Sequence, residues 1–190
     1  MEKNRYDVII IGAGPSGIFC AYELKEKRPE LKILMIEKGR AIENRQCPKR
    51  KTKKCVGCKP CSITTGFAGA GAFSDGKLSL SPDVGGNLPE ILGYDKALEL
   101  IKESDAIYLK FGADKNVYGV DKEKEIREIR KRAIHANLKL IECPIRHLGT
   151  EEGYKIYHRL QDHLTEVGVE MQFMTMVSDI DIEDGQVKSV

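Results

Sequence analysis

The sequence predicts an α/β fold with a parallel central sheet, flanking helices and a β-hairpin, and three observations support this. Short β-branched runs at residues 6–11 and 32–36 are typical of strands buried on both faces. A helical pattern over residues 17–27 separates these strands and stops before Pro29. Near the end of the chain, Asp184-Gly185 lies between two strand-like runs, which favours a hairpin.

The remaining elements follow in order. Residues 1–37 form a βαβ unit, and residues 38–89 form an insertion rich in Cys, Gly and Lys without a regular period. A structureless segment of this length usually carries function. Residues 90–190 contain predicted helices at 95–111, 122–136 and 151–167, predicted strands at 138–143, 169–173 and 176–182, and a return strand at 186–190. Because the sequence stops within this hairpin, we expect residues 1–190 to be the N-terminal part of a longer domain whose C-terminal half is absent.

Composition excludes several classes of function. The chain has 190 residues, is 41% hydrophobic and carries a formal net charge of +2, so no global basic signal indicates nucleic-acid binding. No apolar run approaches the roughly 20 residues of a membrane span, and the N-terminus does not resemble a signal peptide. We therefore expect a cytoplasmic protein that acts on a small-molecule substrate or electron acceptor.

A glycine-rich turn follows the first predicted strand. The stretch GAGPSG gives G-x-G-x-x-G spacing, and Glu37 ends the next strand twenty residues after Gly17. These glycines permit a tight turn, the approach of a pyrophosphate and close helix–strand packing, and the helix N-terminus favours phosphate. Glu37 suits ribose hydroxyls and repels a 2′-phosphate. The sequence predicts a site for FAD or NAD at Gly12, Ala13, Gly14, Pro15, Ser16, Gly17, Glu37 and Lys38.

Longer stretches carry a family resemblance. The segments MEKNRYDVIIIGAGPSGIFCAYEL and LMIEKGR resemble the N-terminus of glutathione-reductase-like flavoproteins with two dinucleotide-binding domains. This resemblance implies a Rossmann-like FAD/NAD(P)-binding domain in which the first motif binds FAD and the backbone at Val177 meets the adenine. SITTGFAGAGAFSDGKLSLSP and IRHLGTEEGYKIYHRL resemble a family of uncharacterised FAD-dependent dehydrogenases. The implied activity is electron or hydride transfer through a bound flavin, with NAD(P)H as a candidate reductant.

A second glycine-rich segment, GFAGAGAFSDGK, spans residues 66–77. Small residues let backbone lie close to a flat ring or a phosphate. We therefore expect Gly69, Ala70 and Gly71 to lie near the isoalloxazine ring or the pyrophosphate. The alternative is a tightly packed turn without a ligand.

Four cysteines, Cys47, Cys55, Cys58 and Cys61, lie among lysines and arginines in the insertion. Their C-x7-C-x2-C-x2-C spacing is compatible with a [4Fe-4S] cluster or a Zn site. A redox-active thiol pair and cysteines without a joint role are the alternatives. For Cys20 and Cys143, which occur in apolar elements, we expect buried structural thiols.

Arg146 and His147 lie in a predicted loop before a helix N-terminus, where they could face a substrate or the flavin. No residue qualifies as a catalytic acid or base by spacing alone. The sequence thus favours an FAD-dependent oxidoreductase. The alternatives are a metal-stabilised binding module on a nucleotide-binding scaffold and a fragment that is inactive on its own.

Overall fold

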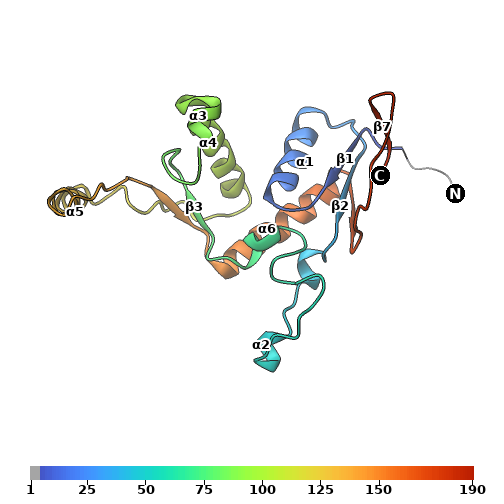
Figure 1. Ribbon diagram of the computed structural model, residues 1–190, viewed down its shortest axis with the longest axis horizontal. Coiled ribbons are helices and arrows are strands. Elements are labelled where there is room, and N and C mark those ends of the chain that lie inside the picture. The colour runs from blue at the N-terminus through green and yellow to red at the C-terminus, as the bar shows by residue number, and fades with distance from the viewer. Residues whose placement is uncertain (1–4) are drawn as a thin grey trace. The chain divides into compact units, whose positions relative to one another are not determined.

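The computed structural model describes residues 5–190 and divides the chain into two units (Figure 1). The first, here called the sheet unit, combines Met1–Phe73 with Tyr157–Val190. The second, the helical unit, is Ser74–Ile156. The sequence did not indicate this division, because the boundaries fall inside a glycine-rich segment and inside a helix.

A three-stranded parallel sheet forms the centre of the sheet unit. Its order is β1 (Val8–Ile11), β2 (Ile33–Glu37) and β5 (Val169–Phe173), which confirms the predicted α/β class. All five residues of β2 are buried because a strand lies on each side of it. The expectation of full burial is wrong for β1, which lies at an edge of the sheet and leaves Ile11 53% exposed.

The two long helices α1 and α6 belong wholly or partly to this unit. Helix α1 (Pro15–Lys27) contacts β1 and β2, and it buries Ile18, Ala21 and Tyr22. Cys20 lies on its outer face and is exposed, so the expectation of a buried thiol there is wrong. Helix α6 (Thr150–Glu166) contributes its part from Tyr157 onward, in which Leu160 and Leu164 are fully buried.

The hairpin is present but shorter than predicted. Strands β6 (Asp181–Glu183) and β7 (Gln186–Ser189) pair in antiparallel fashion. Asp184 and Gly185 both have positive φ, as the two central residues of a type I′ turn require. The residues before Asp181 that were predicted to extend the strand are not in a ladder, and Met176 is 74% exposed.

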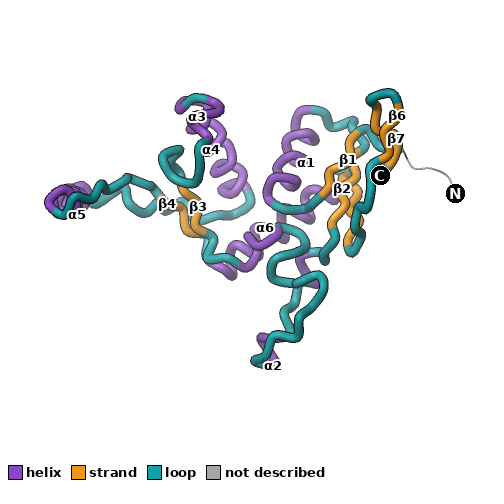
Figure 2. The backbone as a smooth tube through the Cα atoms, viewed as in Figure 1, coloured by secondary structure: helices purple, strands orange, loops and turns teal. Residues whose placement is uncertain are grey.

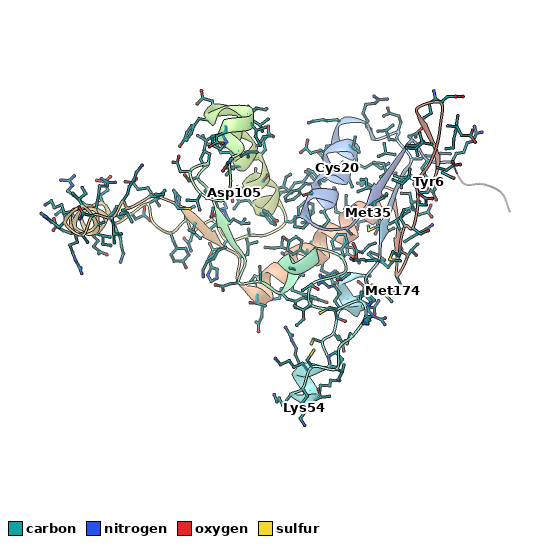
Figure 3. All side chains as sticks on the ribbon, viewed as in Figure 1. Tyr6, Cys20, Met35, Lys54, Asp105 and Met174 are labelled. Carbon is teal, nitrogen blue, oxygen red and sulfur yellow. The ribbon has the colours of Figure 1, made fainter. Side chains whose placement is uncertain are left out.

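Up to Phe73, the insertion forms only short helical turns: η1 (Ile42–Asn44), α2 (Lys49–Thr52) and η2 (Gly69–Phe73). Figure 2 shows loop along most of its path. In Figure 3, Lys54 marks the tip of the projecting part beside α2, away from Met35 in the sheet. The absence of a regular period in the sequence correctly indicated this irregular backbone.

The helical unit contains the antiparallel pair β3 (Lys77–Ser79) and β4 (Ile145–His147) with helices α3 (Leu88–Leu92), α4 (Tyr94–Lys110) and α5 (Glu123–His135). The strand predicted at 138–143 is not formed, and Leu138 and Ile141 are exposed. Strand β4 begins only after Pro144, a residue type that cannot donate a ladder hydrogen bond.

A buried ion pair joins β4 to α4. Arg146 donates from Nε and Nη2 to the two carboxylate oxygens of Asp105 at 2.5 and 2.8 Å, and from Nη1 to the carbonyl oxygen of Asp114 at 2.5 Å. These interactions raise the pKa of Arg146, chiefly through the hydrogen bonds to Asp105. The hypothesis that Arg146 faces a substrate or flavin is therefore replaced by a structural role. Within residues 5–190, no helix is long and apolar enough to cross a membrane.

We expect Arg146→Leu to lower the free energy of unfolding by about 3 kcal/mol, because Asp105 would keep its charge without its partner. Urea denaturation followed by circular dichroism measures this change. The matched control is Arg130→Leu, which breaks the exposed pair of Arg130 with Glu142 and should cost about 0.5 kcal/mol. Equal losses in the two variants would contradict the structural role of Arg146.

Candidate functional site

The turn between β1 and α1 has the geometry that the G-x-G-x-x-G spacing predicts. Gly12 follows β1 with φ +101°, and its N–H donates to the carbonyl oxygen of Ile36 at 2.8 Å. A Cβ on Gly17 would lie 2.1 Å from the carbonyl oxygen of Gly12. Helix α1 can therefore approach β1 this closely only because residue 17 has no side chain.

The N-terminus of α1 is open to an anion. Gly14 is the N-cap residue, and a Cβ added to it would have nothing within 4 Å. No side chain caps the helix, its first turn contains no acid, and Pro15 lies at the first position. The backbone N–H groups and the partial positive charge of this helix end suit a phosphate group.

Glu37 lies at the end of β2 and is only 6% exposed. Its Oε2 accepts a hydrogen bond from the N–H of Ala13 at 2.9 Å. Its Oε1 accepts hydrogen bonds from the N–H groups of Gly39 and Gly66 at 2.8 and 3.1 Å. The carboxylate thus joins three segments that are distant in sequence, a role that the sequence did not indicate.

The second glycine-rich segment returns to the first. The N–H of Ala68 donates to the carbonyl oxygen of Ala13 at 2.7 Å. A Cβ built on Gly69 would lie 3.7 Å from the Cα atom of Gly14. Ala70 is exposed, and Gly71 lies beside the Tyr157 hydroxyl. The structure therefore places Gly69 next to the turn of the fingerprint. Contact of Gly69, Ala70 and Gly71 with a cofactor stays a prediction.

The close approach of Gly39 and Gly66 fixes this return path. A Cβ on Gly39 would lie 2.4 Å from the backbone nitrogen of Gly66. Gly66 has φ +121°, and a Cβ there would lie 2.6 Å from the carbonyl oxygen of Arg40. Two backbones cross here without room for a side chain on either, which sequence analysis did not identify.

Arg45 completes the support of this segment. Its guanidinium donates to the carbonyl oxygens of Ser62, Ile63 and Phe67 at 3.0, 2.7 and 2.5 Å. Burial lowers the pKa of Arg45, and the charges of Glu37 and Cys61 act in the opposite direction. The guanidinium also lies over the ring of Phe73, 4.8 Å from its centroid. Sequence analysis did not identify this role of Arg45.

Lys38 and Val177 are the remaining residues predicted to hold the cofactor. Lys38 is exposed beside the buried Glu37, and Val177 is half-buried. The chain leaves β5 next to the end of β2, where the N–H of Thr175 donates to the carbonyl oxygen of Glu37 at 3.1 Å. The roles of Lys38 and Val177 in holding a cofactor stay predictions.

The four clustered cysteines are free thiols in the structure. Within the described residues, no group of three or more His, Cys, Asp or Glu side chains is arranged to hold a metal ion. The metal site predicted at Cys47, Cys55, Cys58 and Cys61 is therefore not assembled here.

Cys61 is chemically distinct within this cluster. Hydrogen bonds from the backbone N–H groups of Ile63 and Thr64 and from the Thr64 hydroxyl lower the pKa of its thiol. The nearby charge of Arg45 acts in the same direction. Thiolate is the nucleophilic form, so Cys61 combines exposure with a stabilised thiolate.

His147 lies in the helical unit and pairs with an acid. Its Nε2 is 3.0 Å from a carboxylate oxygen of Asp75, which also forms an ion pair with Lys77. The hydrogen bond from Lys77 and then that from His147 lower the pKa of Asp75. The structure thus explains the position of His147 by local pairing, and a role toward a substrate stays a prediction.

Known proteins are similar to this chain in two respects, the sequence near its N-terminus and the fold. A model of the Thi4 family matches residues 1–43. Thiamine thiazole synthases from Coprinopsis cinerea and Phaeosphaeria nodorum are 54% and 61% identical to this chain over 33 residues. That segment is 17% of this chain and 10% of each relative. The family match therefore covers the βαβ unit that contains the fingerprint and the residues up to 43.

Solved structures extend the likeness of fold to most of the chain. L-amino acid deaminase from Proteus vulgaris has a TM-score of 0.50 at 14% identity. A 3-ketosteroid-delta4-(5alpha)-dehydrogenase from Rhodococcus jostii RHA1 has a TM-score of 0.50 at 15% identity. Each covers 96% of this chain, which spans 43% and 41% of their lengths. The mixed α/β architecture is therefore similar in fold to these two enzymes.

We expect Glu37→Gln to lower the free energy of unfolding by about 2 kcal/mol without any added nucleotide. An amide has one acceptor oxygen, so its NH₂ group must face at least one backbone N–H, and that buried donor loses its partner. Urea denaturation measures the loss. Glu30→Gln, at an acid that is 59% exposed, is the control and should change stability little. Unchanged stability of Glu37→Gln would contradict the scaffolding role.

We expect the thiol of Cys61 to react at lower pH than an ordinary thiol, whose pKa is about 8.5. A depressed pKa means that thiolate persists as the pH falls toward neutral. Alkylation by iodoacetamide, followed at Cys61 by peptide mass spectrometry from pH 6 to 10, measures the midpoint. Thr64→Val should shift that midpoint upward, because it removes one hydrogen bond. Identical profiles for the two proteins would contradict this account.

Proposed function

We propose that this chain is the dinucleotide-binding part of an FAD-dependent oxidoreductase and that its fingerprint holds the ADP portion of FAD. The observation that carries the proposal is the open end of α1. The space beside Gly14 is free, the helix lacks a side-chain cap and no acid lies in its first turn. A diphosphate placed there would accept hydrogen bonds from backbone N–H groups and would meet a favourable helix dipole.

The remaining acceptor capacity of Glu37 supports the same ligand. A carboxylate offers about four acceptor positions, and three backbone N–H groups occupy part of this capacity. One position is left for a ribose hydroxyl. The negative charge of Glu37 disfavours a ribose that carries a 2′-phosphate, which favours FAD or NAD over NADP at this site.

The returning segment supports an extended ligand rather than a mononucleotide. Gly69 lies against Gly14, and we propose that Gly69, Ala70 and Gly71 together continue the surface that begins at the fingerprint. Their small side chains leave backbone accessible to the ligand. A bound flavin would supply the hydride or electron transfer, while these residues bind and orient it.

The comparisons support this assignment at the level of fold and fingerprint. The Thi4 family match covers β1, α1, β2 and the residues just beyond them. The architecture resembles that of FAD-binding oxidoreductases. We propose a small molecule as substrate, and the parts of such enzymes that correspond to sequence outside this chain would contribute to its site.

Titration with FAD and with ADP tests the proposal. We expect FAD to bind, as seen by equilibrium dialysis and by a change in the flavin visible spectrum, and we expect ADP to compete for the same site. Gly14→Ala should weaken the binding of both FAD and ADP at least about tenfold, because its methyl group would occupy the space of the pyrophosphate. The stability of this variant should stay close to that of the parent protein, since a Cβ at residue 14 meets nothing within 4 Å.

The matched control is Gly153→Ala, which adds the same methyl group within α6, outside the fingerprint. This variant should bind FAD as the parent protein does. Binding of ADP without binding of FAD would contradict the flavin assignment, and binding of neither would contradict the nucleotide site. Equal loss of binding in the two variants would contradict the role of Gly14.

A further inference from the structure

A cavity lies in the irregular part of the sheet unit, and no residue of the fingerprint lines it. Its volume is about 390 Å³, and its lining includes Arg40, Asn44, Gln46, Cys58, Lys59 and Ser62. This volume is within the range of sites for small molecules. Glu37, Gly12, Gly14 and Gly69 do not line it. The cavity is therefore distinct from the proposed site of the ADP group.

The charge of this cavity is positive and uncompensated. Arg40 and Lys59 line it, and the lining contains no acid. Neither side chain forms a hydrogen bond or an ion pair with any part of the chain from residue 5 onward. Arg45, by contrast, spends its donors on backbone carbonyl groups. Two cations with unused donors thus border one cavity.

The surrounding segment adds to this positive potential. Lys49, Arg50 and Lys51 form most of α2, and Lys53 and Lys54 follow it. The one acid between residues 38 and 61 is Glu43. Its carboxylate already accepts a hydrogen bond from Nε2 of Gln161 at 2.9 Å. A cavity in such a field attracts anions and raises their local concentration.

We propose that this cavity binds a small molecule that carries an oxyanion group, either a phosphate or a carboxylate. Arg40 and Lys59 supply charge-assisted hydrogen bonds, which are the strong ones. The amide of Gln46 and the hydroxyl of Ser62 supply neutral polar contacts, whereas Nδ2 of Asn44 already donates to the Glu43 carboxylate at 3.3 Å. Phosphate and carboxylate share this recognition chemistry, so the test uses one probe for each.

The reactivity of the Cys58 thiol can report binding in the cavity, because Cys58 lines the cavity and is partly exposed. Iodoacetamide is uncharged and reports access to the thiol. We expect inorganic phosphate or succinate to slow alkylation of Cys58, read by peptide mass spectrometry. At a ligand concentration tenfold above its dissociation constant, the rate should fall about tenfold by mass action. Cys55 lies outside the lining and should react at an unchanged rate in the same sample.

Sodium chloride at matched ionic strength is the control for screening. Protection of Cys58 by phosphate alone assigns a phosphate site, and protection by succinate alone assigns a carboxylate site. Equal slowing of Cys55 and Cys58, or equal slowing by chloride, would overturn the proposal. Protection by neither probe would also overturn it.

Variants test the two cations. Arg40→Gln combined with Lys59→Gln should lower the affinity for the protecting anion at least about tenfold, because two charge-assisted hydrogen bonds are lost. Lys51→Gln combined with Lys54→Gln removes two charges from the same segment outside the lining and should retain protection. Equal weakening in both double variants would show a general charge effect and overturn the site.

One further arm separates this inference from the proposed function. FAD is added in place of the anion, and Cys58 alkylation is measured again. Unchanged alkylation beside normal FAD binding supports two separate sites. Protection by FAD with none by phosphate or succinate would overturn the inference, because the cavity would then be part of the dinucleotide site. Anion protection in a protein that fails to bind FAD would support this cavity while contradicting the flavin proposal.

Discussion

Two buried charges hold the long irregular segment of this chain against the sheet. Glu37 accepts hydrogen bonds from backbone N–H groups, and Arg45 donates to backbone carbonyl groups. A segment outside helices and sheets has both kinds of polar group to satisfy when it is buried. Glu37 provides acceptors for backbone N–H groups, and Arg45 provides donors for backbone carbonyl groups. Phe67 and Ala68 can therefore lie in the core although their backbone is irregular.

The candidate site depends on this arrangement more than on the fingerprint alone. The glycines of the turn determine how closely α1 approaches β1, and they leave space at Gly14. Glu37 then ties Ala13, in this turn, to Gly66, which brings the second glycine-rich segment alongside. The same carboxylate therefore positions the surface on which a dinucleotide would lie and offers it an acceptor. Under the proposed function, one side chain would thus serve both a structural and a binding role, at the strand ends where ligands of α/β proteins bind.

Local patterns predicted the parts of the fold that depend on local interactions. The fingerprint, the helices and the bounds of β5 agree with expectation, because spacing and glycine positions determine them. The predicted strand at 138–143 is not formed. A strand forms only where a partner strand is available, and β3, which lies about seventy residues earlier, pairs instead with β4, at residues 145–147. Glu37 was identified as a ribose ligand, but its links to Ala13 and Gly66 depend on tertiary folding. Nothing in the sequence separates Arg45, which is buried, from Arg40, which lines a cavity.

The close approach of Gly39 and Gly66 makes residues 39–66 a loop whose two ends lie together. Whatever lies between residues 46 and 61 starts and finishes near the same point, so its length has little effect on the sheet. That stretch contains the four clustered cysteines and several residues that line the positively charged cavity. We therefore expect insertions, deletions or exchanges within this stretch to leave the sheet and the fingerprint turn intact. Divergence of ligand specificity would then be concentrated in the segment that the fold constrains least.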